Sequence, residues 1–90
     1  MSTAPPVPDW YVYVLYSVST GRLYTGVSTE PRKRLTKHND GTGAKNTRYG
    51  KPWHLVYVEK RQNRSDAQKR EAEIKKMKRK DKIVLTGLAA

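Results

Sequence analysis

Alternating hydrophobic and polar positions predict three strands in this chain. Residues 10–16, WYVYVLY, alternate and are rich in aromatic and β-branched side chains, which is typical of a strand. One face would carry Trp10, Val12, Val14 and Tyr16, and the other Tyr11, Tyr13 and Leu15. The run RLYTGVS, ending at Ser28, follows the turn-forming residues Ser19, Thr20 and Gly21, so the two runs predict a β-hairpin. Residues 53–59 predict a third strand, with Leu55 and Tyr57 on one face and Val56 and Val58 on the other.

Helix signals follow the second and third strands. Residues 28–31, STEP, combine a hydroxyl cap, an acid and a first-turn proline, and predict a helix to about His38. The sequence NDGTG ends it, and residues 39–50 predict a polar loop. A capping box at residues 65–68, SDAQ, opens a helix to about Met77, and a short helix follows from about Lys80 to Thr86. The order β-β-α-β-α-α predicts an α+β fold, a small three-stranded, mostly antiparallel sheet flanked by helices.

The length of 90 residues predicts one small domain, which we place at residues 9–88. Residues 1–8 contain three prolines and predict a disordered N-terminal lead-in. The chain has no cysteine, which excludes a disulfide framework and a cysteine zinc site. No apolar run approaches the roughly 20 residues of a membrane span, and no signal peptide pattern opens the chain. We therefore expect a cytoplasmic protein without a membrane partner.

The formal net charge of +11 indicates a polyanion partner, with nucleic acid the first choice. Residues 60–82 hold eleven Lys or Arg against four acids. The simpler explanation for any one of these lysines is a solvated helix surface with i,i+4 ion pairs. For the cluster as a whole, phosphate binding is at least as good an explanation.

Five side chains are candidates for chemistry. Arg34 and His38 lie four residues apart on the first predicted helix, and Glu71 shares a stripe of the second with Ala67 and Ile74. Tyr13 and Tyr24 belong to the two hairpin strands. Each has an ordinary explanation: strand tyrosines pack at the core or its rim, His38 would favour the helix dipole, and Glu71 would pair with Lys75.

Taken together, these residues match a known pattern. Tyr11–Tyr13 (YVY), Tyr24–Gly26 (YTG), Arg34, His38 and Glu71 occur in an order that resembles the GIY-YIG nuclease family, over roughly residues 10–85. The resemblance is closest to its small, stand-alone bacterial single-domain members, which share the segments HNDGTGAKNTR and AQKREAEIKKM. Two departures are Tyr11 in place of the first glycine and the lack, after residue 73, of the asparagine that many catalytic members carry.

The resemblance implies a metal-dependent endonuclease. Glu71 would hold Mg²⁺ or Mn²⁺, Arg34 would stabilise the scissile phosphate, and a tyrosine would act on the attacking water with His38 as proton acceptor. Tyr13 and Tyr24 both remain candidates for that tyrosine. Gly26 would leave room beside a phenol for a phosphate.

The substrate implied is DNA, including structured or damaged DNA in repair or recombination. The expected backbone contacts are Lys37, Lys45, Arg48, Arg70, Lys75 and Lys78. The alternative is a non-catalytic nucleic-acid-binding module on the same scaffold, and a ribosome-associated protein that prefers structured RNA is a third. We expect a monomer, and a protein partner stays open.

Overall fold

The computed structural model describes residues 7–88 and has the expected element order. The elements are β1 (Trp10–Ser17), β2 (Leu23–Ser28), α1 (Pro31–Asp40), the short 3₁₀ helix η1 (Lys45–Thr47), β3 (Trp53–Arg61), α2 (Arg64–Lys76) and α3 (Arg79–Thr86). Most of the predicted lead-in, residues 1–6, lies outside the described residues, and Val7 and Pro8 belong to no element. The predicted α+β fold is confirmed, with η1 as an addition inside the predicted loop.

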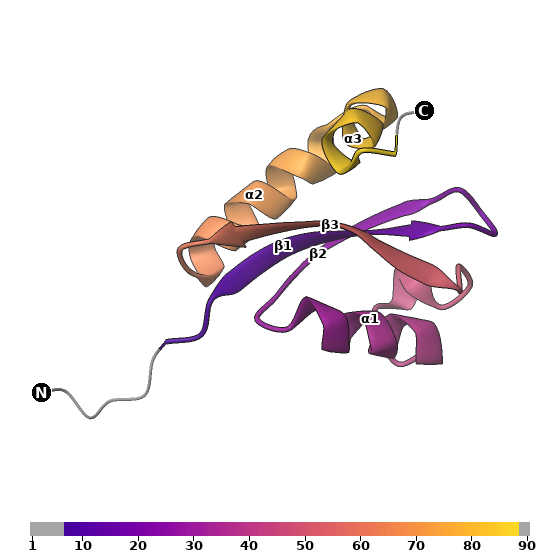
Figure 1. The fold of residues 1–90 in the computed structure, drawn as a ribbon, viewed down its shortest axis with the longest axis horizontal. Coiled ribbons are helices and arrows are strands. Elements are labelled where there is room, and N and C mark those ends of the chain that lie inside the picture. Colours follow the sequence, from indigo (N-terminus) through magenta and orange to yellow (C-terminus); the bar gives the residue numbers. More distant parts are fainter. Residues whose placement is uncertain (1–6, 89–90) are drawn as a thin grey trace, which may run out of the picture.

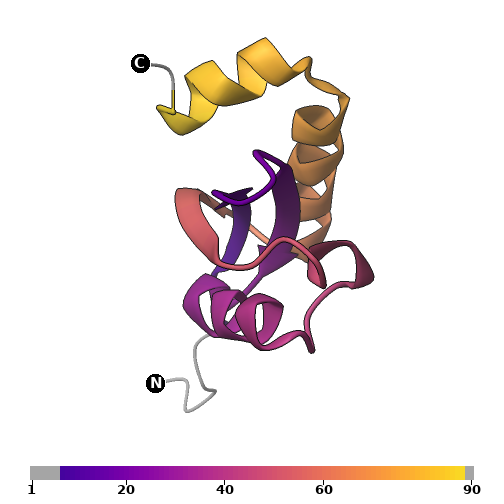
Figure 2. The same ribbon diagram turned by 90° about the vertical axis from the view of Figure 1, so that its right-hand side faces the viewer.

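A three-stranded sheet lies between two layers of helix (Figure 1). Its strand order is β2-β1-β3, and both pairings are antiparallel, so β1 is central and β2 and β3 are edges. Helix α1 covers one face, and α2 with α3 covers the other (Figures 1 and 2). The predicted hairpin is confirmed: Gly21, with φ 74°, closes its turn by donating its N–H to the Ser17 carbonyl at 2.7 Å.

The two faces of β1 build two separate cores, as the alternation predicts. Val12 and Val14 are fully buried and pack with Ala67 and Ile74 of α2. Tyr13 and Leu15 are buried on the opposite face, where Leu35 of α1 and Trp53 contact them. Because the strand is buried on both sides, burial of its apolar surface ties all three layers together.

The faces predicted for the β3 side chains are correct for Leu55 and Val56 and wrong from Tyr57 on. The β1–β3 pairing shifts register between Val14 and Leu15, which pair with Tyr57 and Leu55, so Val56 is an extra residue. Such a bulge breaks the period-2 alternation. Leu55 packs on the α1 side, whereas Val56 and Tyr57 both pack on the α2 side.

Both predicted helix caps are also corrected. Helix α1 begins at Pro31 with Glu30 at the N-cap position, and the Ser28 hydroxyl accepts from the Glu30 N–H outside the helix. Helix α2 is capped by Asn63, whose side chain accepts from the Asp66 N–H at 2.8 Å, in place of the predicted capping box at residues 65–68. Asparagine is as good a cap as serine, and it stands two residues earlier.

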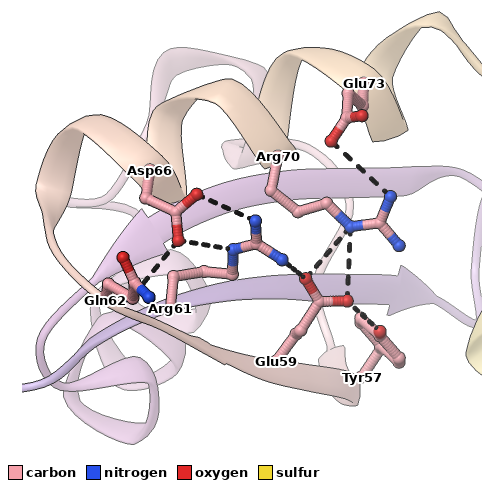
Figure 3. Close-up of polar contacts among 7 residues, drawn as sticks. All are labelled: Tyr57, Glu59, Arg61, Gln62, Asp66, Arg70 and Glu73. Atoms are coloured by element: carbon pink, nitrogen blue, oxygen red, sulfur yellow. Dashed lines mark hydrogen bonds and ion pairs between the residues drawn. The ribbon is translucent and has the colours of Figure 1, made fainter.

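An ion-pair network fixes α2 to the β3 edge of the sheet (Figure 3). The Glu59 carboxylate accepts from Arg61 at 2.9 Å, from Arg70 at 3.0 Å and from the Tyr57 hydroxyl. Arg61 in turn forms two hydrogen bonds with Asp66. Burial raises the pKa of Glu59, but the bonds from Tyr57 and Arg70 outweigh it and hold that pKa below its usual range.

We expect Glu59→Gln to lower the free energy of unfolding by about 1–3 kcal/mol, because two half-buried guanidinium groups lose their shared counter-charge. Urea denaturation at pH 7 measures it. The control is Glu73→Gln, which removes a carboxylate that is 63% exposed and 3.7 Å from Arg70. The Glu73→Gln substitution should lower the free energy of unfolding by less than about 0.5 kcal/mol. Equal effects of the two substitutions would contradict a central role for Glu59.

Candidate active site

The five candidate side chains come from four different elements of the fold. Tyr13 comes from β1, Tyr24 from β2, Arg34 and His38 from α1, and Glu71 from α2. The rings of Tyr24 and His38 lie 4.8 Å apart between centroids, and the Tyr13 ring lies 6.4 Å from Tyr24. Arg34 and Glu71 both lie close enough to Tyr13 for their charges to act on its pKa. Residues 58 positions apart in the sequence therefore share one electrostatic environment.

Gly26 makes room for the phenol of Tyr13. The two residues are paired across the hairpin, and a Cβ on Gly26 would lie 2.6 Å from the Tyr13 hydroxyl oxygen and 2.7 Å from Cζ. Any larger residue would collide with the ring. The expectation that Gly26 leaves space for a phosphate is therefore wrong, because the ring itself occupies that space.

Buried hydrogen bonds fix the orientation of His38. The Thr47 hydroxyl donates to the Ala44 carbonyl at 2.8 Å, so its oxygen accepts from His38 Nδ1–H at 2.7 Å. His38 Nε2 then carries the lone pair and accepts from the Tyr13 hydroxyl at 2.9 Å. The contact from Ala44 N–H to Nδ1 needs the other tautomer, but at 3.4 Å it is the weaker of the two.

The loop after α1 closes over this imidazole. Gly41 ends α1 in the left-handed conformation, with φ 87°. A Cβ on Gly43 would lie 2.6 Å from His38 Nδ1, so the backbone there packs directly on the ring. Thr47, in η1, is 1% exposed, and its carbonyl accepts from the Trp53 indole at 2.8 Å. Sequence reasoning missed Thr47, because a threonine nine residues beyond a histidine, in a polar loop, gives no periodic signal.

The buried pair of Tyr13 and His38 is uncharged at neutral pH. Burial raises the pKa of the Tyr13 phenol, and the charges of Tyr24 and Glu71 add to this, against a lowering by Arg34. Burial and then the positive charge of Arg34 lower the pKa of His38 to about 4. The ordinary explanation of His38 as a cation at the helix C-terminus is therefore wrong. Its imidazole is a neutral proton acceptor.

The two tyrosines differ in their access to solvent. Tyr13 is 1% exposed, whereas Tyr24 is half-buried and lines a surface hollow of about 150 Å³. Lys75 lines the same hollow and pairs with Glu71 at 3.3 Å, the pairing that the i,i+4 spacing predicts. Only Tyr24 of the two can meet a ligand directly.

A single carboxylate is available for a metal ion at this site. Glu71 is 21% exposed, and among residues 7–88 no group of three or more His, Cys, Asp or Glu side chains could hold an ion. One carboxylate with water and phosphate oxygens suits Mg²⁺ or Mn²⁺, which are hard cations that keep several waters. Glu71 therefore fits such an ion only when substrate completes the ligand set.

Of the six cations expected to bind the nucleic-acid backbone, five are exposed and Arg70 is half-buried. Lys37, Lys45, Arg48 and Lys78 are exposed. Arg70 is not available, because its guanidinium is bound to Glu59 at 3.0 Å and lies 3.7 Å from Glu73 (Figure 3). We remove Arg70 from the expected set. Lys75 lies at the hollow beside Tyr24, paired with Glu71.

The fold and these side chains define a small α+β domain of the nuclease class. The chain belongs to the GIY-YIG family, since the model of the GIY-YIG catalytic domain matches residues 9–83. The resemblance seen in the sequence is thereby confirmed. This family is one of nucleases, so it implies nucleic-acid binding, and its members generally use divalent metal ions.

Small bacterial proteins are similar to the chain over most of its length. A UPF0213 protein of Enterococcus faecalis is 50% identical over 74 residues, which cover 80% of this chain and 83% of that protein. A UPF0213 protein of Staphylococcus aureus is 45% identical over 75 residues, 83% of this chain and 90% of that one. The solution NMR structure of a UPF0213 protein from Bacillus halodurans matches with a TM-score of 0.55 and 36% identity, over 89% of this chain and 84% of that one. No helix within residues 7–88 combines the length and apolar character needed to cross a membrane.

The lowered pKa of His38 makes stability depend on pH. An unfolded histidine takes up its proton near pH 6.5, whereas folded His38 does so near 4. Between these pH values the unfolded state binds more protons than the folded state. The contribution of neutral His38 to the free energy of unfolding is therefore full above pH 6.5 and is lost as pH falls to about 4. We expect wild type to lose about 3 kcal/mol more than His38→Gln between pH 7 and 4 in urea denaturation. NMR titration in a His54→Gln background, which leaves one histidine, gives the midpoint, and a midpoint near 6.5 would contradict a buried neutral imidazole.

Thr47→Val tests how the His38 tautomer is fixed. Valine keeps the shape of threonine but cannot accept from Nδ1–H, and an unpaired buried donor costs about 1–3 kcal/mol. We expect a shift toward the Nε2–H tautomer, measured by ¹⁵N chemical shifts of the ring, with loss of the bond from Tyr13. Thr47→Ser keeps the hydroxyl and should keep the wild-type shifts. Unchanged shifts in Thr47→Val would exclude Thr47 as the group that orients His38.

Proposed function

We propose that the chain is a metal-dependent endonuclease that hydrolyses phosphodiester bonds in DNA. The observation that carries this proposal is the neutral, hydrogen-bonded His38 beside Tyr24, with Arg34 and Glu71 acting on the same buried phenol, Tyr13. A structural core would bury apolar side chains here. A phosphodiesterase needs an attacking water, a proton acceptor and positive charge at the phosphate, and these are the groups present.

Tyr24 is the tyrosine that we assign to the attacking water. Its phenol lies at the solvent-accessible hollow, whereas Tyr13 is covered and donates to His38. Tyr24 would orient the water, and the proton that leaves the water would pass to the Tyr13 oxygen as Tyr13 transfers its own proton to His38 Nε2. Attack on phosphorus then breaks the bond to the leaving oxygen, which takes a proton from solvent.

Arg34, and a metal ion held by Glu71, would neutralise negative charge on the substrate phosphate. The Arg34 guanidinium can donate two parallel hydrogen bonds to phosphoryl oxygens. Glu71 would hold Mg²⁺ or Mn²⁺, and such an ion, when bound, neutralises charge on the phosphate. Lys37, Lys45, Arg48 and Lys78 are exposed and would contact the backbone without reading bases. Specificity would then come from DNA shape, which favours branched or damaged substrates. A monomer in the cytoplasm remains our expectation.

A non-catalytic nucleic-acid-binding module is the second candidate. The lack of asparagine after residue 73 favours it, because many catalytic members of the family carry one after the metal-binding glutamate. Such a module would keep the fold and the basic surface and would bind DNA without a metal ion. Salt-dependent binding is expected of both candidates, so only cleavage separates them.

The test is cleavage of linear duplex, single-stranded and branched DNA with Mg²⁺ or Mn²⁺, against a chelator. We expect Arg34→Gln to reduce the rate by about 10²–10³-fold, because it removes a donor aimed at developing charge, and Glu71→Gln to do at least as much. Glu73→Gln is the matched control on the same helix, is 63% exposed, and should keep the rate within about threefold. If wild type cleaves no faster than the Arg34→Gln/Glu71→Gln double variant while still binding DNA, the binding module is correct.

A further inference from the structure

A basic hollow lies beside Tyr24, between the hairpin and the C-terminal helices. It has a volume of about 150 Å³ and is lined by Arg22, Tyr24, Asn46, Trp53, Lys75 and Lys82, among others. These residues come from the hairpin, η1, β3, α2 and α3. The fold therefore assembles the hollow from separate parts of the sequence.

A second hollow, of about 200 Å³, continues from the first along α3. Arg22, Leu23 and Lys82 line both hollows, and Arg79 is added in the second. The Arg79 guanidinium reaches the hairpin turn, where its Nη2 would lie 3.8 Å from a Cβ on Gly21. Leu85 packs into the α2-side core three residues after Lys82, which holds this face of α3 toward the sheet.

Three cations of these hollows have no acidic partner. Within the described part of the chain, Arg22, Arg79 and Lys82 form no ion pair, and no acidic residue lines either hollow. Folding brings these like charges together from the hairpin and from α3, which is unfavourable without an anion. A solvated helix surface with alternating charges would not have this arrangement.

We infer that Arg22, Arg79 and Lys82 form a phosphate subsite for a backbone phosphate of DNA next to the scissile one. The inference rests on the proposed function, because it takes the scissile phosphate to lie at Tyr24. Tyr24 lines the hollow that leads to the three cations, so a strand leaving the catalytic side chains runs between the hairpin and α3. The two arginines can bind phosphate oxygens bidentately, and Lys82 adds a point charge.

In this proposal α3 takes part in substrate binding through Arg79 and Lys82. None of the five candidate catalytic residues lies on α3. Contacts to phosphate position the strand without reading bases, so the subsite would fix the register of the backbone at Tyr24. Neutralising it should weaken binding to all sequences alike.

The test compares two triple variants with the same change of charge. The subsite variant is Arg22→Gln/Arg79→Gln/Lys82→Gln. The matched control is Lys69→Gln/Lys76→Gln/Lys80→Gln, three exposed lysines of α2 and α3 that line neither hollow. Glutamine keeps helix propensity close to that of lysine and arginine. Binding of fluorescently labelled duplex DNA is measured by anisotropy over a range of salt with a chelator present, so that no cleavage occurs.

We expect the subsite variant to bind at least about tenfold more weakly at 0.1 M salt and to lose about 1 from the slope of log K against log salt, since each neutralised phosphate contributes about 0.9. The control should change affinity less than about threefold. Equal losses in the two variants would overturn the subsite, because only net charge would then matter. A loss seen with duplex RNA but not with DNA would overturn the assignment to DNA.

Two further measurements keep the result interpretable. The single variant Arg79→Gln, compared with Lys80→Gln, repeats the test if the triple variant does not fold, and only a larger loss of affinity for Arg79→Gln supports the subsite. Cleavage with Mg²⁺ or Mn²⁺ is assayed separately. Absence of cleavage by wild type rejects the nuclease proposal alone, whereas loss of the difference between the triple variants rejects the subsite alone.

Discussion

The contact of the Tyr13 ring with the backbone of Gly26 is the constraint on which the site depends. Tyr13 is buried because β1 is central, and its phenol reaches His38 only because Gly26 has no side chain on the facing strand. The Thr47 hydroxyl accepts from His38 Nδ1–H, so Nε2 is the nitrogen that accepts from the phenol. One missing Cβ on an edge strand thus lets a buried phenol reach an imidazole on a helix. The same burial removes charge from the pair and leaves Tyr24 as the accessible phenol.

The sequence predicted the element order, the hairpin and the two faces of β1, because these follow from local periodicity and turn residues. It failed where one residue interrupts a period, as at the β3 bulge around Val56. It also failed for contacts between distant segments. The pairing of Glu59 with Arg70 depends on how α2 crosses β3, and no spacing in the sequence reports that crossing. Thr47 was missed for the same reason, since its role comes from the path of a loop.

The candidate site was predictable as a set of residue types, because a family pattern preserves their order. Its geometry was not. From the sequence, Tyr13 and Tyr24 were equivalent candidates for the tyrosine that acts on water. Gly26 was expected to leave room for a phosphate, and Arg70 to bind the nucleic-acid backbone. In the structure, Tyr13 is buried whereas Tyr24 is accessible, and the Tyr13 ring fills the space beside Gly26. The guanidinium of Arg70 is hydrogen-bonded to Glu59. In each case a side chain from another element decided the role.

The two edges of the sheet differ in how their charges are paired. Glu59 and Asp66 are held in the network at the β3 edge, where they neutralise Arg61 and Arg70. At the opposite edge, beside β2, the hollows are lined by Arg22, Lys75, Arg79 and Lys82. Of these four cations, Lys75 pairs with the half-buried carboxylate of Glu71. A domain of net charge +11 that gathers several of its ion pairs at the β3 edge leaves an excess of positive charge at the β2 edge. Under the proposed function, a nucleic acid drawn by that charge would arrive at the hollow beside Tyr24, where Lys75 pairs with Glu71.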